Sequence, residues 1–305
     1  MRQARLLVRW APVLVCGFLT YSLSAQSTKV SQMSHAASSR GTLIAIAPTR
    51  DGIVMAADSR STIASGYCDD THKLIEVSLP KPTALAVPGI GIVFSKPPFG
   101  VTNPCKWIKT APRVMDIERF SKNYLEAHPD DMSDVGVVRL GTASLQEVRK
   151  LVQFSPDAPD AYAGNNLYGI VVASYDRVLR RAAIGVVGVR FNPSTREPEV
   201  TDHAFWSFER ESRGQAFNFG LFEYVPAHVF REGRNFVNVY ANFRPDQRLV
   251  KDISGEEAIA ALSNLIEAAA KTTVLVPTPG GIGIGGSTDI LLLGAEPTPV
   301  RVQWK

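Results

Sequence analysis

Three side chains in the first third of the sequence could support nucleophilic chemistry. They are the hydroxyl of Thr42, the carboxylate of Asp58 and the amine of Lys73. A threonine hydroxyl is a useful nucleophile only when a base removes its proton, and a nearby pair of charged groups can tune such a site. Taken singly, Thr42 is a common strand residue, and Asp58 with Lys73 would be a structural ion pair. Together they predict a nucleophile site, provided that the fold brings them together.

A β-hairpin is expected to bring the hydroxyl to the carboxylate. Two apolar runs flank Arg50-Asp51-Gly52, which is a typical hairpin signal. A two-residue turn at Arg50-Asp51 sets Thr42 opposite Ser59, and cross-strand neighbours lie about 5 Å apart, so Thr42 reaches the neighbourhood of Asp58. Lys73 opens the next apolar run. Both hairpin strands are apolar at nearly every position, which predicts cover on both faces.

The motifs around this hairpin resemble a known family. Gly41-Thr42 precedes it, Ala56-Ala57-Asp58-Ser59-Arg60-Ser61-Thr62 ends it, and Lys73-Leu74-Ile75-Glu76 follows. This pattern is similar to the start of a proteasome β-type subunit, a member of the N-terminal-nucleophile hydrolases. The similarity is dense from Gly41 to about Gly89 and returns at 285–293. It does not extend residue by residue across about 95–250.

The resemblance implies a specific catalytic cycle. The chain would cleave itself between Gly41 and Thr42, so that Thr42 becomes the first residue and its α-amine acts as the base. An α-amine has a pKa near ~7.7, which suits base catalysis at neutral pH. Lys73, paired with Asp58, would favour the neutral amine and stabilise developing negative charge. The backbone N–H of Gly89 would form the oxyanion hole.

The resemblance also implies how a substrate binds. The backbone of Thr62 would pair with an extended substrate by β-augmentation, and Val87 would form the floor of a side-chain pocket. The family's supporting Ser and Asp residues are not found in the middle of this sequence. Three functions therefore stay open: a threonine peptidase, an amidase of the same superfamily that acts on small molecules, and a catalytically silent structural or binding homologue.

The first 41 residues have the composition of an export leader. Arg2, Arg5 and Arg9 precede an apolar stretch, and Ser24-Ala25 supplies small residues for cleavage. This layout predicts a signal peptide over residues 1–25. The apolar stretch is shorter than the about 20 residues of a membrane span, although an uncleaved anchor is the alternative. Residues 26–41 are rich in Ser and Ala and are expected to form a propeptide or linker. The body, 42–305, would be one secreted or periplasmic domain.

Charge and composition exclude several partners. Residues 1–41 hold five basic residues and no acidic one, so residues 42–305 carry a formal charge of −1, five below the +4 of the whole chain. This distribution does not favour nucleic-acid binding. The glycines at 280–286 lack the Lys-Ser/Thr of a phosphate loop, and no Cys/His spacing suggests a metal site, so no cofactor, no ATP and no metal are expected.

An exported enzyme without an ATP-driven unfoldase would act on short or unfolded peptides. The resemblance implies a homo-oligomer.

Cys68 and Cys105 are candidates for a disulfide. Cys16 lies within the expected signal peptide, which leaves these two cysteines in an oxidising compartment. A bridge would close a loop that carries Lys73 and Gly89. Two separate thiols are the alternative, because sequence fixes no distance.

The order of elements predicts an α+β fold, and the resemblance implies a four-layer αββα sandwich of two antiparallel sheets flanked by helices. Residues 61–71 are expected to be a polar loop. Thr110 is expected to cap a helix that ends before Pro129. Ser254, with Glu257 three residues later, is expected to cap the clearest helix.

Overall fold

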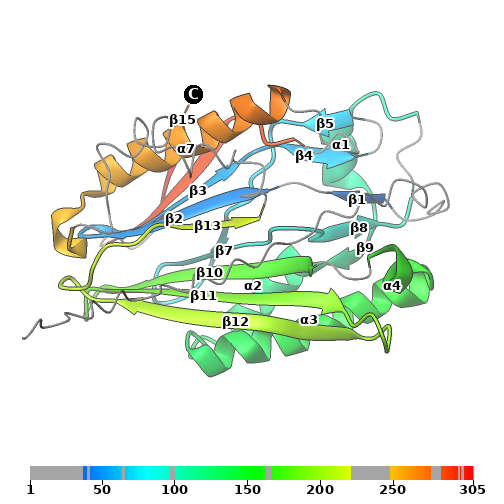
Figure 1. The fold of residues 1–305 in the computed structure, drawn as a ribbon, viewed down its shortest axis with the longest axis horizontal. Helices are drawn as coiled ribbons and strands as arrows, with labels where there is room; N and C mark the ends of the chain where they lie inside the picture. Colours follow the sequence, from blue (N-terminus) through cyan, green and yellow to red (C-terminus); the bar gives the residue numbers. More distant parts are fainter. Residues whose placement is uncertain are drawn as a thin grey trace, which may run out of the picture. The chain divides into compact units, whose positions relative to one another are not determined.

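The computed structural model describes residues 37–39, 42–63, 66–96, 100–162, 166–220, 248–275, 283–294, 296 and 299–304. All of them fall in one compact unit, Met33–Lys305. The expected signal peptide and most of the expected propeptide lie outside the described residues. Within the described ranges, the structure is mixed α and β with antiparallel sheets, as the order of elements predicts (Figure 1).

One five-stranded antiparallel sheet carries the predicted hairpin at its centre. Its strands, in spatial order, are β13 (Phe217–Gly220), β2 (Leu43–Thr49), β3 (Gly52–Asp58), β14 (Thr288–Gly294) and β15 (Val300–Trp304). Thr49 pairs with Gly52 and Ile44 with Ala57, which is the register that the turn at Arg50-Asp51 predicts. Every residue of β2 and β3 is buried, so both faces are covered, as expected.

A second five-stranded antiparallel sheet packs against the first. Its strands, in spatial order, are β12 (Pro198–Phe208), β11 (Arg181–Phe191), β10 (Asn166–Asp176), β7 (Thr83–Ala86) and β6 (Ile75–Val77). Ile44 and Ile46 of β2 share a core with Val171 and Ala173 of β10. Because strand side chains alternate in direction, Leu43 and the other odd-numbered residues of β2 face the opposite way.

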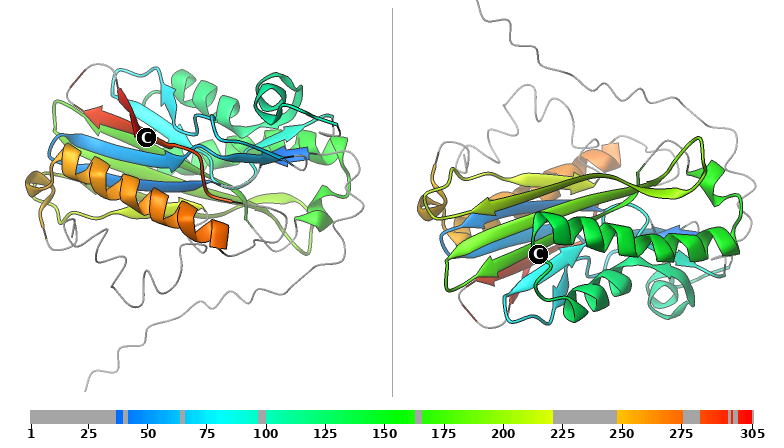
Figure 2. Two further views of the ribbon diagram at one scale, coloured as in Figure 1. Left: turned by 90° about the horizontal axis from the view of Figure 1, so that it is seen from above. Right: turned by 90° about the horizontal axis from the view of Figure 1, so that it is seen from below.

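Helices cover the outer face of each sheet (Figure 2). Helix α7 (Gly255–Leu275) packs on β2, β3 and β14, and the N–H of Glu257 donates to the hydroxyl of Ser254, as the capping signal predicts. Helices α2 (Ile117–Ala127) and α3 (Asp134–Phe154) lie against the second sheet. Two short helical turns are also present, α4 (Ala158–Ala161) and η4 (Val250–Asp252).

Short elements join the two sheets near the end of β3. Strands β1 (Ala37–Ser39), β8 (Ile92–Phe94) and β9 (Arg113–Asp116) form one small sheet, and β4 (Ser61–Ile63) pairs with β5 (Gly66–Cys68) in another. Strand β1 pairs with β8 and also contacts β4. Helix α1 (Pro104–Thr110) packs beside β5. These elements surround the site described below.

Two local expectations are wrong. Residues 61–71 contain β4 and β5 rather than only a polar loop. Thr110 ends α1 instead of capping the next helix, and the cap of α2 is Asp116, whose carboxylate accepts from the N–H of Arg119. Strand β9 occupies 113–116 because it pairs with β8, and this tertiary pairing overrides the local helical periodicity.

No helix among the described residues is both long and apolar enough to cross a membrane.

Candidate active site

Thr42 lies directly before β2, where the hairpin meets the end of β3. It is 6% exposed, and it lies one residue before Leu43, whose N–H donates to Oδ1 of Asp58 at 2.8 Å. This bond forms because the hairpin register carries the start of β2 to the last residue of β3. The hairpin therefore places the threonine next to the carboxylate, as its turn predicts.

Asp58 and Lys73 form a buried ion pair. The Nζ of Lys73 lies 2.9 Å from Oδ2 of Asp58, and the two residues are 5% and 0% exposed respectively. The backbone N–H of Gly285 also donates to Oδ2 of Asp58, at 3.5 Å. The carboxylate is thus held from three segments that are distant in sequence, which fixes the position of the lysine beside Thr42.

Burial acts on both partners of this pair. It lowers the pKa of Lys73 below its ordinary value, and the charge and hydrogen bond of Asp58 oppose that shift. Burial raises the pKa of Asp58, against the charge of Lys73 and the N–H of Leu43. Desolvation disfavours each isolated charge, whereas the 2.9 Å contact favours the two charges together.

Four of the predicted site residues line one pocket of about 160 Å³. They are Thr42, Lys73, Val87 and Gly89. Ligand sites for drug-sized molecules are roughly 300–1,000 Å³. This pocket is smaller and suits a single amino-acid side chain or a group of that size.

Gly89 occupies a position that requires glycine. Its φ is +95°, and a Cβ there would lie 2.7 Å from the carbonyl oxygen of Leu167. Gly89 faces Tyr168 in an isolated antiparallel bridge, whose hydrogen bonds are donated by the N–H groups of Ile90 and Gly169. The N–H of Gly89 is not used in that bridge, and Gly89 borders the pocket that contains Thr42.

The two predicted substrate-binding residues are placed differently. Val87 is buried and lines the pocket with Thr42. Thr62 lies in β4 opposite Tyr67 and does not line the pocket; its neighbour Ser61 does. The expected role of Thr62 concerns its backbone beside an extended chain, and β4 is the strand that β1 contacts.

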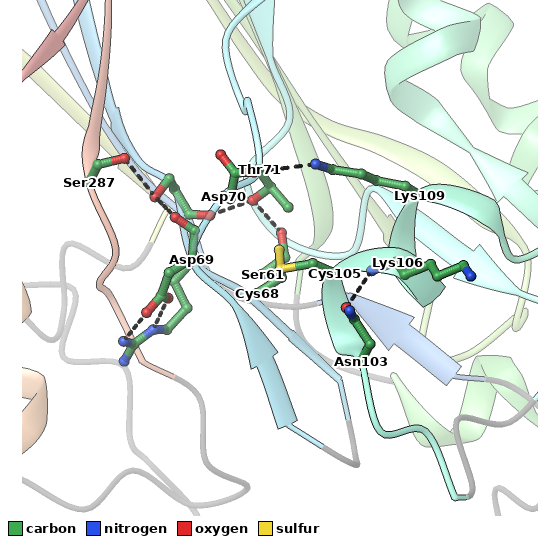
Figure 3. The surroundings of a disulfide bond; sticks show 12 residues. Ser61, Cys68, Asp69, Asp70, Thr71, Asn103, Cys105, Lys106, Lys109 and Ser287 are labelled. Atoms are coloured by element: carbon green, nitrogen blue, oxygen red, sulfur yellow. Dashed lines mark hydrogen bonds and ion pairs between the residues drawn. A yellow bond between two sulfur atoms is a disulfide. The ribbon is translucent and has the colours of Figure 1, made fainter.

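Cys68 and Cys105 are joined by a disulfide, with their Cα atoms 4.8 Å apart. The bridge ties β5 to α1 (Figure 3). Helix α1 carries Ile108 and Lys109 to the wall of the pocket, and Nζ of Lys109 lies 3.3 Å from Oδ2 of Asp70. The disulfide therefore holds one wall of the pocket to the segment that leads to Lys73.

The structure places Glu118, which the sequence did not single out, among the charged groups of the pocket. Glu118, in the first turn of α2, lines the pocket with Thr42 and Lys73. A glutamate in the first turn of an amphipathic helix is ordinarily a solvated residue that favours the helix dipole. No local signal distinguishes this one, because its inward position depends on β9 preceding α2.

One predicted site residue lies beyond this geometry. Gly41, the other side of the expected self-cleavage bond, lies outside the described residues. Among the described residues, no group of three or more His, Cys, Asp or Glu side chains could hold a metal ion.

Among the comparisons with known proteins, only the comparison with solved structures finds matches. No protein-family model matches the chain, and no curated protein matches its sequence. Matching solved structures include the helical assembly of the Anbu complex from Pseudomonas aeruginosa, at 13% identity and a TM-score of 0.45 over 86% of each chain. An Anbu (Gly-1) mutant from Hyphomicrobium sp. strain MC1 matches at 14% identity and a TM-score of 0.45, over 86% of this chain and 88% of that one. Anbu (ancestral beta-subunit) from Yersinia bercovieri matches at 10% identity and a TM-score of 0.43, over 86% of this chain and 87% of that one.

Proposed function

We propose that this chain is an exported threonine-type N-terminal-nucleophile hydrolase that cleaves itself between Gly41 and Thr42 and then hydrolyses peptide bonds. The observation that carries the proposal is that Thr42 shares one small pocket with Lys73, whose ammonium is paired with the fully buried Asp58. The resemblance of residues 41–89 to proteasome β-type subunits supports the same assignment.

Self-cleavage requires only groups of the chain and water. The hydroxyl of Thr42 attacks the carbonyl carbon of Gly41, its proton passes to the amide nitrogen, the C–N bond breaks, and the acyl group remains on the hydroxyl oxygen as an ester. Water then hydrolyses the ester. The products are the carboxylate of Gly41 and a Thr42 with a free α-amine, which is the base that peptide hydrolysis needs.

In the hydrolysis that follows, the α-amine of Thr42 takes the proton of its own hydroxyl, and the oxygen attacks the substrate carbonyl. The N–H of Gly89 donates to the resulting oxyanion. The protonated amine gives its proton to the leaving nitrogen as the C–N bond breaks, and water hydrolyses the acyl-enzyme ester. Lys73 keeps a positive charge beside these steps, because Asp58 holds it. That charge favours the neutral amine and the anionic transition state.

Substrate binding by backbone pairing is supported by a segment of the chain itself. Strand β1, which ends two residues before Gly41, pairs with β8 and contacts β4 (Figure 1). We infer that an extended peptide takes the same place between β8 and the backbone of Thr62. Val87 then lies in the wall of the pocket that receives a substrate side chain.

The proposal also covers architecture and location. The packing of α7 on one sheet, of the two sheets on each other, and of α2 and α3 on the second sheet supports a four-layer αββα sandwich. We propose residues 1–25 as the signal peptide, 26–41 as the propeptide and 42–305 as a secreted or periplasmic hydrolase domain. The family resemblance favours a homo-oligomer, and the charge distribution and the missing phosphate-loop motif favour neither nucleic acid nor ATP as a partner.

Hydrolysis assays on a substrate panel test this function. Peptides with a fluorogenic amide should be cleaved by the wild type, weakly by Thr42→Ser and not by Thr42→Ala. Thr49→Ala, a buried threonine at the other end of β2, is the control for general effects of losing a buried hydroxyl. Cleavage of small acyl amides but not of peptides would replace the peptidase by an amidase. No cleavage of either class by the wild type would favour the silent homologue.

A further inference from the structure

We propose that Glu118 is a specificity-determining residue that selects a cationic side chain, of the lysine or arginine type, in the pocket beside Thr42. The inference rests on the proposed function for its biological meaning, because it names the substrate class of that same site. Its physical basis is a comparison of which charged side chains in the pocket wall have an oppositely charged partner and which have none.

Glu118 belongs to the wall next to the expected floor of the pocket. It lines the pocket with Val87 and Gly91. A Cβ placed on Gly91 would lie 2.9 Å from Cγ1 of Val87 and 3.8 Å from Cγ of Glu118. Gly91 therefore lies between the apolar floor and the acidic side chain; a Cβ there would crowd Val87 and make only ordinary contact with Glu118.

The cationic side chains of the same wall already have carboxylate partners. The pairs, with their N–O distances, are Lys73 with Asp58 at 2.9 Å, Lys109 with Asp70 at 3.3 Å, and Arg113 with Asp116 at 2.7 Å. A substrate carboxylate would therefore have to compete with a partner that is built into the chain. The cations of this pocket do not predict an acidic substrate.

Glu118 is in the opposite situation. Within the described part of the chain, its carboxylate forms no hydrogen bond and no ion pair, although it lines a pocket with three cations. Glu118 is half-buried, so its carboxylate loses part of its hydration without gaining a partner, and an ammonium or guanidinium supplies that partner at charge-assisted strength. The volume of about 160 Å³ admits one such side chain.

The state of the empty site fits this role. Burial raises the pKa of Glu118 to about 7, and Asp116 raises it further, while Arg113 and Lys73 oppose the shift. Below about pH 7, protonation keeps the empty pocket free of an unpaired charge. When a cation enters, the ionised form is favoured, so the proton leaves and an ion pair forms. An uncharged side chain of the same shape as arginine or lysine cannot form this ion pair.

Binding of two isosteric amides tests the inference without relying on catalysis. N-acetylarginine amide and N-acetylcitrulline amide have similar shapes and differ in charge. Calorimetric titration of the wild type at pH 8 should give about tenfold tighter binding of the arginine amide, because hydrogen bonds to charged groups contribute more than neutral ones. In Glu118→Gln the preference should fall to about twofold or less.

A matched variant on the same helix controls for loss of an acidic group. Glu126→Gln, whose carboxylate accepts from the N–H of Ser78 outside the pocket, should keep the preference. Equal binding of the two amides to the wild type overturns the inference, and so does an unchanged preference in Glu118→Gln. The first comparison needs no variant, so a misfolded Glu118→Gln cannot hide a failure.

The inference and the proposed function can fail separately. An arginine preference that depends on Glu118, in a protein that cleaves no amide, would reject the hydrolase and keep the cation site. Peptide hydrolysis that depends on Thr42 but is equal at arginine and citrulline would reject the cation site and keep the hydrolase.

Discussion

The Nζ of Lys73 lies 2.9 Å from Oδ2 of Asp58, and neither side chain is more than 6% exposed. This contact joins the end of the hairpin to the segment that enters the second sheet. Removing either partner alone leaves a charge in the protein interior, whereas removing both leaves none.

Removing one partner of this ion pair is expected to lower the free energy of unfolding more than removing both partners. Lys73→Met leaves the Asp58 carboxylate without its ammonium, and the free energy of unfolding should fall by about 3–5 kcal/mol. The double variant Asp58→Asn/Lys73→Met should be more stable than Lys73→Met, because the asparagine oxygen still accepts from the N–H of Leu43. Guanidinium unfolding curves of the wild type, both single variants and the double variant measure the effect. A double variant as unstable as the sum of the singles would contradict the account.

The disulfide should stabilise the fold and hold the wall of the pocket. Cys68 and Cys105 are 37 residues apart in sequence, and closing a loop of this length is worth about 2–4 kcal/mol. Cys68→Ser/Cys105→Ser should therefore unfold at lower denaturant concentration and show faster amide hydrogen exchange over 104–110. Reductant should lower the melting temperature of the wild type and leave that of the double variant unchanged. A reductant-insensitive wild type would show that the bridge does not form.

Glu118 should make stability depend on pH in a defined direction. Its pKa is raised from 4.5 to about 7 by burial and by Asp116, against Arg113 and Lys73, which face it from β9 and from the segment before β6. The raised pKa means that the protonated group contributes stability below pH 4.5, and that this contribution is lost as pH rises through about 7. The difference in unfolding free energy between wild type and Glu118→Gln should change by no more than ~3 kcal/mol across this range.

Unfolding curves at pH 4.5, 6 and 8 measure this difference. Glu126→Gln, on the same helix but outside the pocket, should show no comparable change with pH relative to wild type. If Glu118→Gln tracked the wild type across the range, Glu118 would titrate as a solvated glutamate and would not belong to the interior of the pocket.

The hairpin and its register could be predicted from sequence because the information is local. A turn signal between two apolar runs determines which residues face each other, and the observed pairing of Thr49 with Gly52 follows from it. Lys73 could be placed because the family resemblance includes its motif. The hairpin prediction uses only neighbours along two strands and one turn, whereas the position of Lys73 follows from the resemblance.

The position of Glu118 in the pocket wall could not be predicted because it depends on a tertiary contact, the pairing of β9 with β8. Residues 110–128 have one helical periodicity, yet 113–116 form β9. The gain from pairing with β8 outweighs that local preference, so α2 begins only at Ile117, and Glu118 in its first turn lines the pocket. The cysteine pairing is likewise a distance between β5 and α1, which no local pattern encodes.

Intact-mass spectrometry of the purified exported protein tests the central claim most directly. The account predicts that the folded wild type has the mass of a chain that begins at Thr42, and that Thr42→Ala keeps the residues before position 42. Thr49→Ala, the control, should be processed like the wild type. A folded, exported wild-type protein that retains the peptide bond between Gly41 and Thr42 would contradict the account.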